Sequence, residues 1–199
     1  GYDMIGVDSS AQMLEKAMEK KERSGQDILY LLQDMREFEL YGTIRAVISV
    51  CDSMNYILSE EDLEQVFSCV NNYLDPEGLF IFDLKTIHYF RDVCGDCVLA
   101  DSREEGSFIW ENSWFEEERM NEYDLTLFIR ESSGLYRREQ ELHDQRGYEI
   151  SVVRQILEHA GMKFVAALDA DTMEQPTELS ERIYIVAREH GKKKGTGNV

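Results

Sequence analysis

Short apolar runs alternate with helical segments along the first half of the chain. The runs lack the strict alternation of apolar and polar residues that a half-exposed strand shows. Between the last two runs, residues 59–74 repeat apolar side chains at helical spacing. Buried strands separated by helices predict a parallel sheet that is covered on both faces. The four runs span residues 4–7, 28–32, 45–50 and 79–84, the last after the predicted turn "DPEG".

The first run ends on Asp8 and leads into a helix with clear boundaries. Ser9 or Ser10 is a typical capping residue, and Gly25 is a typical stop. Asp8 is therefore expected at the carboxyl end of a strand, where open α/β sheets bind their ligands. An acid at the tip of the second strand commonly binds the two hydroxyl groups of a ribose. The alternative is a carboxylate that only caps the helix.

The second half of the chain has a different pattern. Aromatic residues partly alternate with polar ones in residues 108–115, 122–129 and 135–143. This pattern predicts antiparallel strands with one face in water. A helix is expected at residues 151–160, ended by Gly161. Two last strands are expected at 163–168 and 182–187.

Composition limits the partners that the protein can have. The chain has 199 residues, of which 43% are hydrophobic, and this is enough for one compact core. A formal net charge of -19 argues against nucleic acid and against an anionic membrane surface. A small-molecule substrate fits better, and a protein substrate is the alternative. No apolar stretch resembles a membrane span or a secretory leader, so we expect a cytoplasmic protein.

Cys94 and Cys97 have the CxxC spacing of zinc and redox sites. No second pair accompanies them, and Cys51 and Cys69 are expected on a strand end and a helix. A structural zinc site needs four ligands. We therefore expect reduced thiols and no metal, which leaves the role of this pair open.

Several motifs together carry a resemblance to a known family. Their order along the chain resembles a class I S-adenosylmethionine-dependent methyltransferase of the small bacterial type. The likeness covers nearly the whole chain and implies a transferase with S-adenosyl-L-methionine as cofactor. The motifs are "MIGVDSSAQMLEKA", "LLQDM", "VISVCDSMNYI", "LDPEGLFIFDL" and "ERIYIVARE".

The resemblance implies a Rossmann-like, doubly wound, mostly parallel α/β sheet with an inserted antiparallel β-sheet. The expected parts are a cofactor-binding core at 1–92, an antiparallel insertion covering the substrate side at 93–147, a return to the core at 148–190 and a disordered tail at 191–199. In this family "GYDMIGVD" follows a first strand and a glycine-rich loop, which the chain lacks. We expect a chain truncated at its start. The gap at the centre of the sheet would be closed by rearranged strand pairing or by a second copy, making a homo-oligomer.

The family's site residues can be transferred where the motifs match. Asp8 would bind the ribose hydroxyls, Asp34 the adenine amino group, and Met35 the adenine ring. Ser9 would also belong to the cofactor site. Cys51 and Asp52 would line the methionine end of the cofactor, while Asn55 and Tyr56 would face the substrate. For each residue, the alternative is a turn or core role.

Methyl transfer is an in-line displacement, so positioning supplies most of the acceleration. A base is needed where the N or O acceptor must lose a proton first. His143 and Tyr56 are the candidates for this catalytic role, and a simple surface or packing role is the alternative for His143. Two other functions stay open. A nicotinamide-dependent oxidoreductase also uses an acid at the second strand tip, and a non-enzymatic binding module or inactive fragment needs no cofactor.

Overall fold

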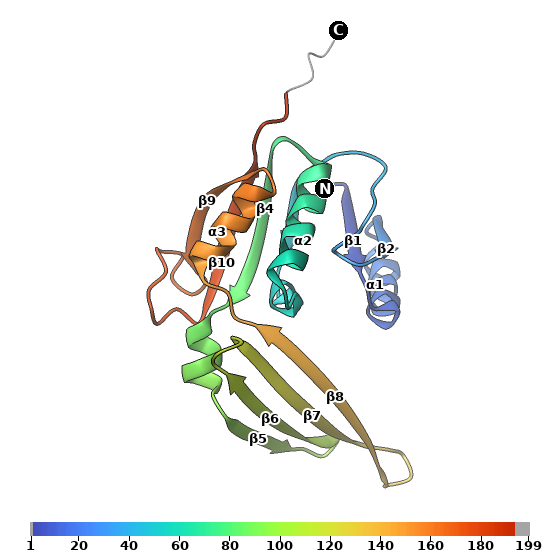
Figure 1. Cartoon of the computed structure of the whole chain (residues 1–199). Coiled ribbons are helices and arrows are strands. Elements are labelled where there is room, and N and C mark those ends of the chain that lie inside the picture. The colour runs from blue at the N-terminus through green and yellow to red at the C-terminus, as the bar shows by residue number, and fades with distance from the viewer. Residues whose placement is uncertain (1, 194–199) are drawn as a thin grey trace.

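The computed structural model describes residues 2–193, and the expected tail at 191–199 lies mostly outside the described residues. Figure 1 shows two sheets placed end to end, with the amino-terminal unit beside the upper one. The first elements in chain order are β1 (Met4–Asp8), α1 (Ala11–Ser24), β2 (Ile28–Leu32), β3 (Ile44–Ser49), the 3₁₀ turn η1 (Ser53–Tyr56), α2 (Glu60–Tyr73) and β4 (Leu74–Lys85). The rest are the π-helix η2 (Tyr89–Cys94), β5 (Cys97–Ser102), β6 (Gly106–Phe115), β7 (Met120–Arg130), β8 (Tyr136–Arg146), α3 (Ile150–His159), β9 (Met162–Asp169) and β10 (Arg182–Glu189).

The strands form three sheets. A four-stranded sheet has the order β3-β4-β10-β9, in which β3 and β4 are parallel and β10 is antiparallel to both of its neighbours. β5 to β8 form an antiparallel meander. β1 and β2 form a separate parallel pair. The predicted fold class, an α/β sheet with an inserted antiparallel sheet, is confirmed.

The core lies between the four-stranded sheet and the two helices α2 and α3, which cover the same face of it (Figure 1). Phe67 of α2 is fully buried and contacts the rings of Phe80 and Phe82 on β4, with ring centroids 5.8 and 5.3 Å apart. Tyr148, at the junction between β8 and α3, is also buried. Its hydroxyl donates to the carbonyl oxygen of Ile57, so the end of the meander is tied to η1.

The predicted helix boundaries agree closely with the structure. The hydroxyl of Ser10 accepts a hydrogen bond from the amide of Met13 at 3.3 Å, and Gly25 ends α1 with a φ of 66°. Ser59 caps α2 in the same way. Gly161, the predicted stop of α3, has a φ of 79°. These positions were predictable because capping and left-handed backbone are properties of single residues.

The strands differ from the prediction at two points. The turn expected at "DPEG" lies inside β4, which begins at Leu74, and the register with β3 shifts between Ile44 and Ala46. The extra residues of β4 between Leu74 and Leu79 form a bulge, in which Glu77 has a left-handed φ of 65°. β5 lies inside the antiparallel insertion expected at 93–147, but it was not among the three strands expected there. Its residues Cys97 to Ser102 pair with Asn112 to Ser107 of β6.

The expected rearranged pairing beside β1 is also wrong for the described residues. β1 pairs with β2, β3 pairs with β4, and no ladder joins the two sheets. The segment between β2 and β3 is anchored on the core instead, because Phe38 is buried there against Tyr73. Exposed apolar residues remain on the strands at this gap, such as Val7 on β1 and Ile48 on β3. Closure by a second copy stays a prediction.

Within residues 2–193, no helix is both long enough and apolar enough to cross a membrane.

Candidate functional site

The parallel strands bring several predicted site residues to one edge of the fold. In Figure 1, β1 and β4 run in the same direction, toward the meander of β5 to β8. Asp8 is the last residue of β1, and its Oδ1 accepts a hydrogen bond from the amide of Ser10 at 2.8 Å. Ser9 lies exposed between them. The contact orients the carboxylate of Asp8 and leaves its second oxygen without a partner among residues 2–193.

Asp34 follows β2 and is held by Arg36. The Nε of Arg36 donates to Oδ1 at 3.0 Å and its Nη2 to Oδ2 at 2.6 Å. These side-chain hydrogen bonds lower the pKa of Asp34 below its ordinary value. Nη1 of Arg36 also donates to Asp62 on α2 at 3.2 Å, which ties this loop to the core. The side chain of Met35, predicted against adenine, packs against the core.

The chain leaves β3 through two residues with left-handed backbone. Cys51 has a φ of 68° and Asp52 a φ of 64°, which is uncommon for residues other than glycine. The carboxylate of Asp83 accepts both of their amides, from Cys51 at 3.1 Å and from Asp52 at 3.0 Å. Asp83 is only 2% exposed. A buried acid of β4 therefore fixes the turn at the end of β3.

Two cations balance the charge of this turn. Nζ of Lys85 lies 3.0 Å from Oδ2 of Asp52, and Arg182 forms ion pairs with both Asp52 and Asp83. Burial alone would lower the pKa of Arg182, but its contacts with the two carboxylates raise it above its ordinary value. Lys85 also lies 5.0 Å from the centre of the Tyr89 ring. The cluster places two acids and two bases together, so it carries no formal net charge.

Asn55 was predicted to face the substrate, and the structure places it elsewhere. Its side chain is fully buried. The amide group donates to the carbonyl oxygens of Lys85 at 3.2 Å and Arg146 at 2.8 Å, and its oxygen accepts the amide of Lys85 at 2.9 Å. Both amide hydrogens are therefore bound to backbone. The side chain links η1 to the ends of β4 and β8.

Tyr56 and His143, the two predicted catalytic residues, lie together. The hydroxyl of Tyr56 is 3.1 Å from Nδ1 of His143 and 2.7 Å from the hydroxyl of Tyr123. The Tyr123 and His143 rings stack with centroids 4.6 Å apart, and Trp110 lies 4.7 Å from Tyr123. The cluster joins η1 of the core to strands β6, β7 and β8 of the meander.

The tautomer of His143 follows from its second partner. Nε2 lies 3.3 Å from Oε2 of Glu141, and a carboxylate can only accept, so Nε2 carries the hydrogen. Nδ1 of the neutral ring is then free to accept the hydrogen of Tyr56. Burial, followed by the hydrogen bond to Tyr56, raises the pKa of Tyr123 above its ordinary value. Tyr123 stays protonated and donates to the oxygen of Tyr56.

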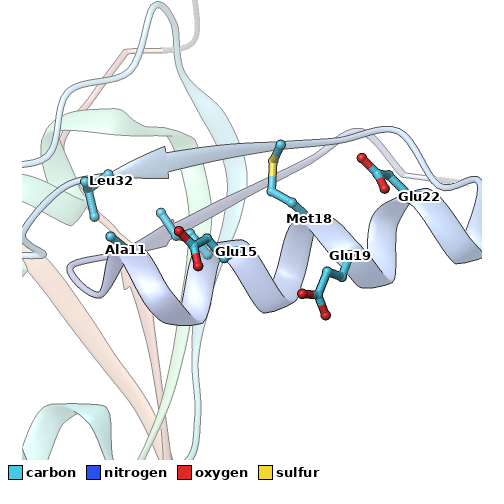
Figure 2. Close-up of a pocket in the computed structure, with 7 residues that line it drawn as sticks. Ala11, Glu15, Met18, Glu19, Glu22 and Leu32 are labelled. Carbon is cyan, nitrogen blue, oxygen red and sulfur yellow. The ribbon is translucent and has the colours of Figure 1, made fainter.

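The hollows beside α1 lie apart from this cluster. A groove of ≈530 Å³ is lined by Leu14 and Met18 of α1, by Leu32 of β2 and by acidic residues including Glu15 (Figure 2). A second hollow of ≈330 Å³ reaches Asp8 from beside α1. The large groove contains none of the predicted site residues.

Comparison with known proteins agrees with this geometry. Residues 1–78 match the family model described as "Methyltransferase domain". A protein of Geobacillus sp. (strain WCH70), named as a methyltransferase, is 35% identical over 94% of this chain and 76% of its own length. The chain belongs to the class I S-adenosylmethionine-dependent methyltransferases.

Two further similarities extend the comparison. The crystal structure of an S-adenosylmethionine-dependent methyltransferase from Clostridium acetobutylicum superposes with a TM-score of 0.88 at 25% identity, covering 96% of this chain and 76% of that one. A glycine/sarcosine N-methyltransferase of Halorhodospira halochloris is 29% identical over 42% of this chain and 32% of its own length. The methyltransferase family confirms S-adenosylmethionine as the cofactor.

The donor and acceptor chemistry of the strand tips fits this cofactor. The ribose supplies two hydroxyl donors, and the second oxygen of Asp8 is available to accept one. The adenine amino group is a donor as well, and Asp34 supplies an ionised acceptor at the next strand. Beyond the third strand, Cys51 is exposed on a fixed turn. Binding of the cofactor by Asp8, Asp34 and Cys51 stays a prediction.

The structure shows all four cysteines as free thiols. Among the described residues, no group of three or more histidine, cysteine or acidic side chains is arranged to hold a metal ion. Burial raises the pKa of Cys94 above its ordinary value, so its thiol is protonated at neutral pH.

Sequence reasoning missed the residues that support the site. Asp83 stands in the apolar run "LFIFDLK" and Arg182 begins the run "RIYIVA". A charged residue within a buried strand is a signal that could have marked both. Glu141 had no such signal, because it alternates with other charged residues on β8.

Proposed function

We propose that this methyltransferase transfers a methyl group to the nitrogen of a small-molecule amine, with Tyr56 and His143 removing the proton. The hydrogen bond of 3.1 Å between them is the observation that carries the proposal. A hydroxyl acceptor is the alternative. S-adenosylmethionine supplies a methyl group that is already activated by its positive sulfur, so the protein has to orient the acceptor and manage one proton.

The arrangement suits removal of a proton from an ammonium group. The Tyr56 oxygen accepts the proton of the amine while its own hydrogen passes to Nδ1 of His143. Glu141 stabilises the imidazolium that forms, because it accepts from Nε2. Tyr123 donates to the same Tyr56 oxygen at 2.7 Å and holds it in place.

Two observations favour an amine. The name of the Halorhodospira relative states glycine and sarcosine as acceptors, both of which are amines. The protein's formal net charge of -19 attracts cationic molecules.

The test is an assay of S-adenosylhomocysteine formation with glycine, sarcosine and simple primary amines as acceptors. Because the chain spans 76% of the Geobacillus relative, the assay is run on the chain and on a longer version that includes any residues encoded upstream of it. Tyr56→Phe is expected to lower kcat by about 10²- to 10⁴-fold, because general base catalysis contributes about that much.

The matched control is Tyr136→Phe, which removes an exposed hydroxyl from the far end of β8. Its kcat is expected to stay within about twofold of the unmodified protein, since surface changes of this kind have small effects. If hydroxyl compounds are methylated and amines are not, the nitrogen acceptor is wrong. If Tyr56→Phe has the activity of Tyr136→Phe, the base is wrong.

A further inference from the structure

Two buried carboxylates of the same sheet hold left-handed residues, and only one of them faces the site. Asp83 on β4 accepts from Cys51 and Asp52, as described above. Glu189 at the end of β10 accepts the amide of Glu77 at 2.9 Å and that of Lys192 at 2.7 Å. Each acid is 2% exposed. Because β4 and β10 are antiparallel, the two acids lie toward opposite ends of the sheet.

The end of the β3 ladder explains why the turn needs a side chain. β3 pairs with β4 up to Ser49, which lies opposite Phe82. Beyond this pair the backbone leaves the sheet, so the amides of Cys51 and Asp52 have no strand partner. Asp83, the residue after Phe82, supplies both acceptors from its two oxygens. A left-handed conformation of two successive residues with side chains is strained and persists only where the surroundings fix it.

The contacts around Asp83 fix its own position as well. Arg182 forms ion pairs with Asp83 and Asp52 together, and Lys85 lies 3.0 Å from Asp52. Asp52 is thus held through its backbone and its carboxylate at once. The side chain of Cys51 stays exposed at the tip of the strand.

We propose that Asp83 is a positioning residue for the cofactor: it locks the left-handed turn at Cys51 and Asp52 in the shape that receives the amino-acid end of S-adenosylmethionine. This inference rests on the proposed function, in which S-adenosylmethionine is the methyl donor, and on its amino-acid end lying beside Cys51 as the family resemblance implies. Asp83 acts through the two amides and does not itself contact the ligand. Glu189 holds Glu77 far from the site and has only a structural role.

The experiment compares Asp83→Asn with Glu189→Gln. Both substitutions keep the size of the side chain and replace one accepting oxygen by a donating NH₂ group, which then opposes a backbone N–H. Binding of S-adenosylmethionine is measured by calorimetry on the chain and on its longer version. Asp83→Asn is expected to raise Kd at least about tenfold, whereas Glu189→Gln leaves it within about twofold, because a lost charged hydrogen bond corresponds to about a tenfold change or more.

Amide hydrogen exchange without any ligand is the second readout. In the unmodified protein, the amides of Cys51 and Asp52 are expected to exchange about as slowly as those of β4, although they lie in a turn. In Asp83→Asn they are expected to exchange at least about tenfold faster. This measurement needs neither a methyl acceptor nor catalysis. Slow exchange of the two amides in the unmodified protein tests the fixed turn even if a variant fails to fold.

The possible failures are distinguishable. Fast exchange of the two amides in the unmodified protein overturns the lock itself. Equal weakening of cofactor binding by Asp83→Asn and Glu189→Gln overturns the positioning role, since a common loss of stability then explains both. If the unmodified protein binds S-adenosylmethionine but methylates no amine, the proposed function fails while the role of Asp83 stands.

Discussion

The four-stranded sheet with α2 and α3 differs from the β1-α1-β2 unit in how much of its apolar surface is covered. Leu63, Val66, Phe67 and Val70 of α2 are all buried. α1 has the same length and a similar amphipathic pattern, yet none of its residues is buried. Met13 and Met18 of α1 are 59% and 50% exposed. The same kind of pattern therefore produced a core helix in one region and an uncovered helix in the other.

The difference shows that an apolar stripe predicts a helix face but not what covers it. α2 packs against both the sheet and α3, whereas the main contacts of α1 within residues 2–193 are with the two short strands of its own unit. Stability should consequently be concentrated in the four-stranded sheet. The β1-α1-β2 unit carries Asp8 and leads into Asp34, so the predicted cofactor contacts lie in the region expected to be less stable.

The largest expected effect separates the two regions by stability. Phe67→Ala should lower the free energy of unfolding by about 3–5 kcal/mol, because it opens a cavity against Phe80 and Phe82. Met18→Ala should lower it by less than about 0.5 kcal/mol, since Met18 is half exposed. Urea denaturation followed by circular dichroism measures both.

Repeating the denaturation at two protein concentrations sharpens the comparison. A second copy covering α1 or the gap beside β1 would make the cost of Met18→Ala rise with concentration. A concentration-independent cost as large as that of Phe67→Ala would contradict the difference between the two regions.

A smaller effect concerns the ionic link between the regions. Arg36 joins Asp34 to Asp62 of α2, and it lowers the pKa of Asp34 below its ordinary value of 3.8. A carboxylate with a lowered pKa stabilises the fold above its unfolded pKa, and this stabilisation is lost as the pH falls through the folded pKa. Arg36→Met should therefore cost less than about 1 kcal/mol at pH 7, because the pair is partly exposed.

The pH dependence identifies the source of that cost. The difference in unfolding free energy between the unmodified protein and Arg36→Met should shrink as the pH falls below about 4. Denaturation at pH 7, 5 and 3 measures it. A difference that is the same at all three values would show that the contribution of Arg36 does not come from Asp34.

Local signals in the sequence predicted most of the fold. The caps at Ser10 and Ser59 and the stop at Gly25 depend on single residues. The strands β1 to β4 were predicted from short runs of consecutive apolar residues. The bulge at Glu77 was not predictable in this way, because its left-handed backbone is held by Glu189, more than a hundred residues later. The position of the separate β1-β2 pair also depends on long-range contacts. The segment after β2 packs on the core through Phe38 and bonds to α2 through Arg36.

In the candidate site, too, some residues were predictable from local sequence and others only from tertiary contacts. Tyr56 and His143 were predictable as reactive side chains, and the structure brings them together because Asn55 and Tyr148 tie η1 to the ends of β4 and β8. Asn55 was predicted to face the substrate. The sequence does not distinguish an asparagine in an exposed loop from one that is buried and bound to backbone. Its buried position follows only from the tertiary contacts.

The most direct test of the account is cofactor binding by Asp8→Asn, which keeps a helix-capping side chain but removes the charge. On the chain and its longer version, calorimetry should show S-adenosylmethionine bound about 10- to 100-fold more weakly, as expected for the loss of a charged hydrogen bond. Asp27→Asn, a fully exposed acid of the same unit, is the matched control and should leave Kd unchanged. Equal affinities for the two variants would contradict the assignment of the strand tips to the adenosyl group.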